Sequence, residues 1–176
     1  MSSLLGLFFG IAGLASAVAF PGTVREAPDP TRRYAVVWSE ATDDKPHRLS
    51  LVDKKSNIQR PLATFPRHVS VLWSPDSTAL SVTDWEGSDY SSIQVYFVEA
   101  TKDSVSIPAA LKKAKGILPQ IAQNHHVYFE AIEWRDRSTL LFQVRGYGDH
   151  DPSGFTRRFE YGPAGKFRPV EGSAGE

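Results

Sequence analysis

Short runs of alternating apolar and polar residues recur along most of the chain. Leu49 and Leu51 fall on one side of an extended segment, and Val95 and Phe97 do the same in a second segment. Successive side chains of a strand point to opposite faces of a sheet, so this pattern predicts short, half-buried antiparallel strands. The chain is therefore expected to be all-β.

The predicted strands group into three similar units, at residues 32–62, 68–108 and 126–170. Each unit consists of a strand, an acidic loop, a strand that ends in a carboxylate, a tight turn and a short strand closed by proline. The second and third units each begin with a further apolar strand, at His68–Trp73 and His126–Trp134, which precedes this common pattern. We therefore expect a single domain over residues 32–171, built from antiparallel four-stranded meander repeats.

One motif recurs between the first two strands of these units. The residues from Trp73 to Leu80 read Trp-Ser-Pro-Asp-Ser-Thr-Ala-Leu, and Trp134 to Leu141 keep the Trp, the Ser-Thr pair and the final Leu. This motif resembles the WD40-like repeat of TolB-type and prolyl-oligopeptidase-type β-propellers. The resemblance implies four-stranded antiparallel blades and a binding or scaffold role, and it carries over no catalytic residue.

The number of units limits the architecture. Propellers have 4–8 blades, and this chain offers about two and a half. A closed ring from one chain is therefore not expected, and the repeats form either a partial or open propeller or a sandwich-like stack. A short helical insertion is expected at residues 108–123, where Ser106 can cap the helix and Pro108 suits its first turn.

The N-terminal segment has the composition of a secretory signal peptide. Residues 3–20 carry no charge, and the apolar run ends in two small-x-small sites, Ala15-Ser16-Ala17 and Ala17-Val18-Ala19. We expect a signal peptide over residues 1–19, a linker over 20–31, a disordered tail over 172–176, and export to the periplasm or the extracellular space. The alternative is an uncleaved membrane anchor.

Composition narrows the function classes. The 176 residues contain 20 basic and 20 acidic side chains, so no basic excess favours nucleic acid or an anionic membrane surface. There is no cysteine, which excludes disulfides, thiolate metal sites and a cysteine nucleophile. The sequence also lacks a Gly-x-Ser-x-Gly elbow, a His-Glu-x-x-His motif and a Gly-rich phosphate loop.

Acidic and aromatic residues gather in the loops that follow Trp38, Trp85 and Tyr147. If the units are equivalent, these loops lie at the same end of the sheets. The candidate ligand-binding residues are Asp43, Asp44, Trp85, Asp89, Tyr90, Tyr147, Asp149, His150 and Asp151. Carboxylates could bind calcium and aromatic faces could stack on a sugar, but the loops lack the regular carboxylate spacing of a calcium loop. No metal or cofactor is therefore assigned.

These observations favour an exported, non-enzymatic module that binds a protein or a carbohydrate. Two alternatives remain: a small metal-dependent or carboxylate-based hydrolase using Asp149, His150 and Asp151, or a subunit of a larger β-assembly, homo-oligomers included. The pair His125-His126 is not expected to hold one metal ion, because adjacent strand residues point to opposite faces.

Overall fold

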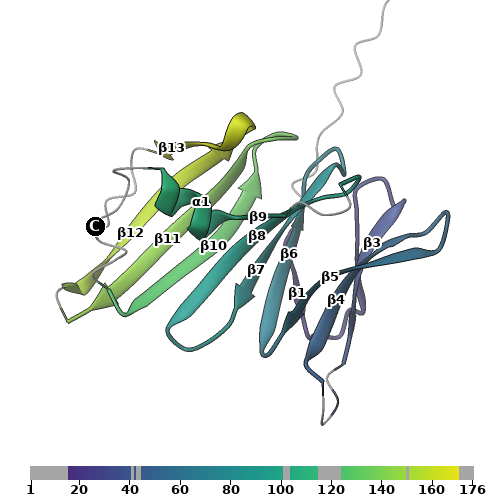
Figure 1. The fold of residues 1–176 in the computed structure, drawn as a ribbon, viewed down its shortest axis with the longest axis horizontal. Helices are drawn as coiled ribbons and strands as arrows, with labels where there is room; N and C mark the ends of the chain where they lie inside the picture. Colours follow the sequence, from purple (N-terminus) through teal and green to yellow (C-terminus); the bar gives the residue numbers. More distant parts are fainter. Residues whose placement is uncertain are drawn as a thin grey trace, which may run out of the picture.

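The computed structural model describes residues 16–40, 42, 45–100, 104–114, 124–149 and 151–170. It confirms the predicted all-β fold of antiparallel meanders with one short helix. The strands follow one another along the long axis of the molecule, with the N-terminal strands at one end and the C-terminal strands at the other (Figure 1). No helix in the described part of the chain is long and apolar enough to cross a membrane.

The first repeat is a separate four-stranded antiparallel sheet. Its strands, in spatial and sequence order, are β2 (Glu26–Pro28), β3 (Tyr34–Ser39), β4 (His47–Asp53) and β5 (Ile58–Phe65). The segment expected to be a linker, 20–31, therefore contains the leading strand of this repeat. A strand of three residues that ends in proline is too short to show alternation in the sequence, but its Ala27 is 1% exposed and belongs to the core.

The second and third repeats share one nine-stranded sheet. The second consists of β6 (His68–Trp73), β7 (Ala79–Trp85), β8 (Tyr90–Phe97) and β9 (Ser104–Ser106), and β1 (Val18–Phe20) pairs with the free edge of β6. The third consists of β10 (His126–Trp134), β11 (Leu140–Gly148), β12 (Asp151–Gly162) and β13 (Lys166–Val170). A short parallel pairing between β8 and β10, through Tyr90↔Val127 and Ser91↔Tyr128, joins the two repeats.

The predicted helix is present as α1 (Ile107–Lys113). The Ser106 hydroxyl accepts a hydrogen bond from the Ala109 amide at 3.4 Å, as expected of a capping residue. Ile107 and Leu111 are buried and pack in the same core as residues of β8 and β10 (Figure 1). The remainder of the expected insertion, residues 115–123, lies outside the described residues.

Two hydrophobic cores lie on the two faces of the second repeat. One joins β6 and β7 to the first repeat and includes Val71, Trp73 and Leu80. The other joins β6, β7 and β8 to α1 and the third repeat, and it includes Ile93 and Val95. Since both faces of this sheet are covered, β7 is apolar or small at nearly every position instead of alternating.

The hairpin between the first and second strands has the same anchor in each repeat. In every copy an aspartate carboxylate accepts backbone N–H groups that follow it in the turn: Asp29 from Thr31 and Tyr34, Asp76 from Thr78, and Asp136 from Ser138 and Thr139. A short polar side chain satisfies turn amides that would otherwise lack a partner. The aspartate anchor of the motif seen in two repeats is therefore present in the first as well, within Asp29–Tyr34, without the motif's Trp and Leu.

Candidate functional site

Six of the nine candidate binding residues belong to the described part of the chain. Asp43, Asp44 and His150 lie outside it, so the structure does not place them. The described six are Trp85, Asp89, Tyr90, Tyr147, Asp149 and Asp151. Asp89 and Asp149 are exposed loop residues, whereas Asp151 is half-buried and begins β12.

The loops of the second and third repeats come together at the start of β10. The Val127 amide donates to the Asp89 carbonyl at 2.9 Å, and the Tyr128 hydroxyl donates to the Ser88 carbonyl at 2.5 Å. Tyr147, on β11, is the cross-strand partner of His126, which lies two residues before Tyr128 on β10. The first loop, which follows β3, falls largely outside the described residues, so the structure does not test whether it joins the other two.

Four side chains on adjacent strands form a compact aromatic and basic group on the outward face of the third repeat. His126 stacks on Tyr147 with ring centroids 4.3 Å apart and an interplanar angle of 11°. The Arg145 guanidinium lies over the Tyr128 ring, 4.8 Å from its centroid. With 44% exposure, Tyr147 presents its free ring surface to solvent. We call His126, Tyr128, Arg145, Tyr147 and the adjoining Asp89 the tyrosine surface.

The strand register produces this group. His126 opposes Tyr147 and Tyr128 opposes Arg145, so all four side chains leave the same face of the β10–β11 ladder. Gly146 separates Arg145 from Tyr147, and a Cβ there would lie 2.6 Å from the His126 carbonyl and 2.8 Å from the Phe155 ring. The close approach of β10 and of the Phe155 ring to β11 at this point needs glycine, which lets the two flanking side chains hold their positions.

The tyrosine surface carries charges of both signs. Burial raises the pKa of Tyr128, the Tyr147 hydroxyl and the Asp89 carboxylate raise it further, and Arg145 opposes them. The phenol therefore stays protonated at neutral pH and remains a hydrogen-bond donor. His125 lies 3.7 Å from Asp149, with both side chains largely exposed, so this ion pair contributes little to stability.

Trp85 and Tyr90 lie at the edge of the same region. Trp85 stacks on His68 at 5.5 Å and 17°, which repeats the His126–Tyr147 pairing one repeat earlier. Tyr90 is 36% exposed, and burial together with nearby Glu86 raises its pKa. Trp38, near the end of the corresponding strand of the first repeat, is 9% exposed, packs against Phe20 in the core and donates to the Val24 carbonyl.

The carboxylates of this region are too scattered for an evident cation site. Among the residues that the structure describes, no three His, Cys, Asp or Glu side chains come close enough to hold a metal ion. His126 and His125 separate as expected of adjacent strand residues, with His126 against Tyr147 and His125 beside Asp149. The arrangement provides ring faces, a guanidinium and hydrogen-bonding groups, which is the chemistry of recognition.

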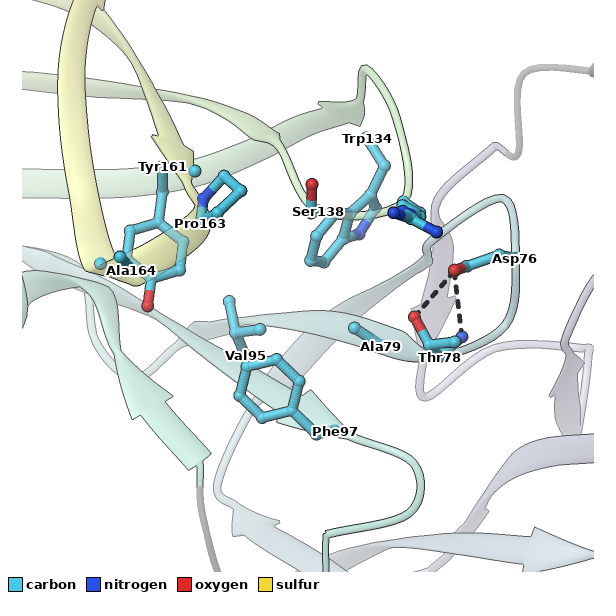
Figure 2. A pocket seen from close by; sticks show the side chains of 13 residues that line it. Asp76, Thr78, Ala79, Val95, Phe97, Trp134, Ser138, Tyr161, Pro163 and Ala164 are labelled. Carbon is cyan, nitrogen blue, oxygen red and sulfur yellow. Dashed lines mark hydrogen bonds between the residues drawn. The ribbon is translucent and has the colours of Figure 1, made fainter.

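A hollow that was not predicted from the sequence lies between the second and third repeats, at the end of the strands opposite the tyrosine surface (Figure 2). Its volume is about 420 Å³, and the rings of Phe97, Trp134 and Tyr161 line it together with Arg137 and Asp76. Three hairpin turns, at 76–78, 137–138 and 162–165, surround it. The sequence shows each turn, but it carries no signal for the space that the second and third repeats leave between them.

A carboxylate at the interface of the first two repeats is also unusual. Asp84 lies on the same face of β7 as Leu80 and Val82, and its Oδ1 is buried with no hydrogen-bond partner among the described residues. Burial, helped by the charge of Glu86, raises the pKa of Asp84 to about 6.

Comparison with known proteins gives a likeness of fold alone. No family model matches the chain, and no curated protein sequence matches it. Among solved structures, a prolyl endopeptidase is similar over 92% of this chain, with a TM-score of 0.50 and 13% sequence identity. The chain spans about a quarter of that protein, 23% of its length. This weak likeness agrees with the resemblance seen in the Trp73–Leu80 motif, and the endopeptidase's activity does not follow from it.

Proposed function

We propose that this chain is an exported, non-enzymatic binding module built of propeller-type repeats, and that it recognises a protein partner through the tyrosine surface. The observation that carries the proposal is the stack of His126 on exposed Tyr147 beside the Arg145–Tyr128 pair. Tyrosine and arginine are the residue types that contribute most to protein interfaces, and rings held by cross-strand packing lose little entropy on binding.

The shape of the region supports a macromolecular ligand over a small one. The tyrosine surface is formed by side chains standing on the face of one sheet, whereas the hollow lined by Phe97 lies at the other end of the strands. Small molecules usually bind in concave sites that cover most of their surface. A carbohydrate stacked on Tyr147 is the alternative ligand.

The polar outward face of the third repeat also supports a module that ends at this repeat and does not stack on a further one. Besides the tyrosine surface, this face carries a hydrogen bond from Gln143 to Glu130 at 2.7 Å and an ion pair of Glu160 with Arg168. Arg135 adds a second ion pair to Glu160 at 3.1 Å. A polar face of this kind is typical of the terminal unit of a repeat array and offers little apolar area to a further repeat.

The test is site-specific photocrosslinking of the exported protein. A photoreactive phenylalanine replaces Tyr147 in one variant and Phe97, similarly exposed at 38%, in a matched control. We expect a protein adduct of discrete mass from position 147 alone, reduced at least fivefold when Arg145→Ala is added. Equal adducts from both positions, or none from 147, would refute the proposal, and binding of purified polysaccharides to the unmodified protein would favour the carbohydrate alternative.

A further inference from the structure

The N-terminal strand belongs to the fold. Val18, Ala19 and Phe20 of β1 pair with Val71, Ser70 and Val69 of β6 in an antiparallel register. The Phe20 side chain is fully buried and lies 6.4 Å from the Trp38 ring, within the core between the first two repeats. Val18 is half-buried and packs against the same core.

This strand distinguishes the two small-x-small sites at the end of the apolar segment. Cleavage after Ala17 leaves all of β1 on the mature chain, with Val18 as its first residue. Cleavage after Ala19 removes two of the three paired residues and leaves Phe20 as the N-terminus. A new charged ammonium group would then be attached to a residue that is 0% exposed, and burying an unpaired charge is costly.

The residues before β1 differ from it in environment. Ser16 and Ala17 are exposed and form no strand, so the first described strand begins at Val18. From this junction, we propose that the chain carries a signal-peptidase site between Ala17 and Val18, recognised through Ala15 and Ala17, and that the mature protein begins with Val18. This inference rests on the proposed export. It places the cleavage two residues earlier than the predicted boundary at residue 19.

Signal peptidase binds small side chains at the third and first positions before the cut bond. Ala15→Leu therefore disrupts the site after Ala17 and leaves the site after Ala19 intact. Ala19→Leu does the reverse, and it introduces its side chain at an exposed position of β1. The two variants are matched in chemistry and differ only in which junction they block.

The experiment expresses the full chain, with a C-terminal affinity tag, in a bacterium that has the general secretory pathway. N-terminal sequencing and intact mass are measured on the purified product. We expect Val-Ala-Phe-Pro as the N-terminus of the natural sequence and Val-Leu-Phe-Pro as that of Ala19→Leu, and at least a tenfold loss of the N-terminus at Val18 in Ala15→Leu. A product of the natural sequence that begins with Phe20, or one that retains Met1, overturns the proposal.

A second measurement tests the structural reason independently of export. Chains released from a cleavable fusion at Val18 and at Phe20 are compared by thermal unfolding. We expect the chain that begins at Phe20 to melt about 3–6 °C lower, because it has lost most of β1. Equal melting temperatures would show that Val18 and Ala19 do not stabilise the fold, and they would overturn the structural reason for a cut after Ala17. Neither readout depends on the crosslinking of Tyr147, so failure of one proposal is distinguishable from failure of the other.

Discussion

Trp73 and Trp134 make the same hydrogen bond one repeat apart. The indole nitrogen of Trp73 donates to the Ala27 carbonyl at 3.1 Å, and that of Trp134 donates to the Leu72 carbonyl at 3.1 Å. Each acceptor lies in the first strand of the preceding repeat, one residue before the end of that strand. The bond therefore fastens each repeat to the one before it, and both indoles are buried.

Replacing Trp134 by Phe keeps most of the apolar contact and removes the donor. The Leu72 carbonyl then loses the indole donor and keeps the longer hydrogen bond from the Ser81 hydroxyl, at 3.4 Å, so we expect a loss of about 1 kcal/mol in unfolding free energy. Trp73→Phe should cost a similar amount, and the two losses should add because they act at different interfaces. Urea denaturation measures all three variants, with Trp85→Phe, at the half-buried edge, as a control expected to change little.

Asp136→Ala removes the anchor of the third hairpin. The Ser138 amide is the largest of the causes that hold the pKa of Asp136 below its usual value of 3.8. A depressed pKa in the folded state means that the stabilisation is present above pH 3.8 and is lost as pH falls through the folded pKa. We expect Asp136→Ala to lose roughly 1 kcal/mol at pH 7. The difference should shrink below pH 4 in thermal unfolding, and Asp136→Asn, which keeps an acceptor, should lose less.

Asp84→Asn should stabilise the protein at neutral pH. Burial, then Glu86, raises the pKa of Asp84 from 3.8 to about 6, so the folded state favours the protonated carboxyl. The penalty is absent below pH 3.8, grows between pH 4 and 6, and is complete above pH 6. After allowance for solvent screening of a half-exposed group, we expect a gain of about 1 kcal/mol at pH 7.5. Denaturation curves that show no gain at pH 7.5, or an equal gain at pH 4, would contradict this.

Gly146→Ala tests the close approach that shapes the tyrosine surface. The added Cβ meets the His126 carbonyl at 2.6 Å and the Phe155 ring at 2.8 Å, and backbone on the neighbouring strand cannot yield cheaply. We expect a loss of about 2 kcal/mol, or roughly 5 °C in melting temperature. Gly162→Ala is the matched control, since nothing lies within 4 Å of its Cβ position and its φ of −116° suits any residue.

The sequence predicted most of the structural features that the repeats have in common. Alternation located the strands, and the Trp-to-Leu motif located two of the three anchored hairpins. The short helix was visible from Ser106 and Pro108. These features are local, since each depends on residues within one strand or one turn, and the chemistry of a few neighbouring side chains specifies them. β2 was missed because its three residues, the last of which is Pro28, are too few to show an alternation of apolar and polar positions.

Tertiary structure alone decided how the repeats meet. Trp38 and Trp85 end equivalent strands, but Trp38 is buried against Phe20 because the N-terminal segment returns to cover it. The tyrosine surface depends on a cross-strand register, and the hollow beside Phe97 depends on how the second and third repeats are placed against each other. A linear pattern records which face a residue points to, but it does not record what lies opposite that face. The local order of this protein was therefore readable from its chain, and the surface that we propose for binding was not.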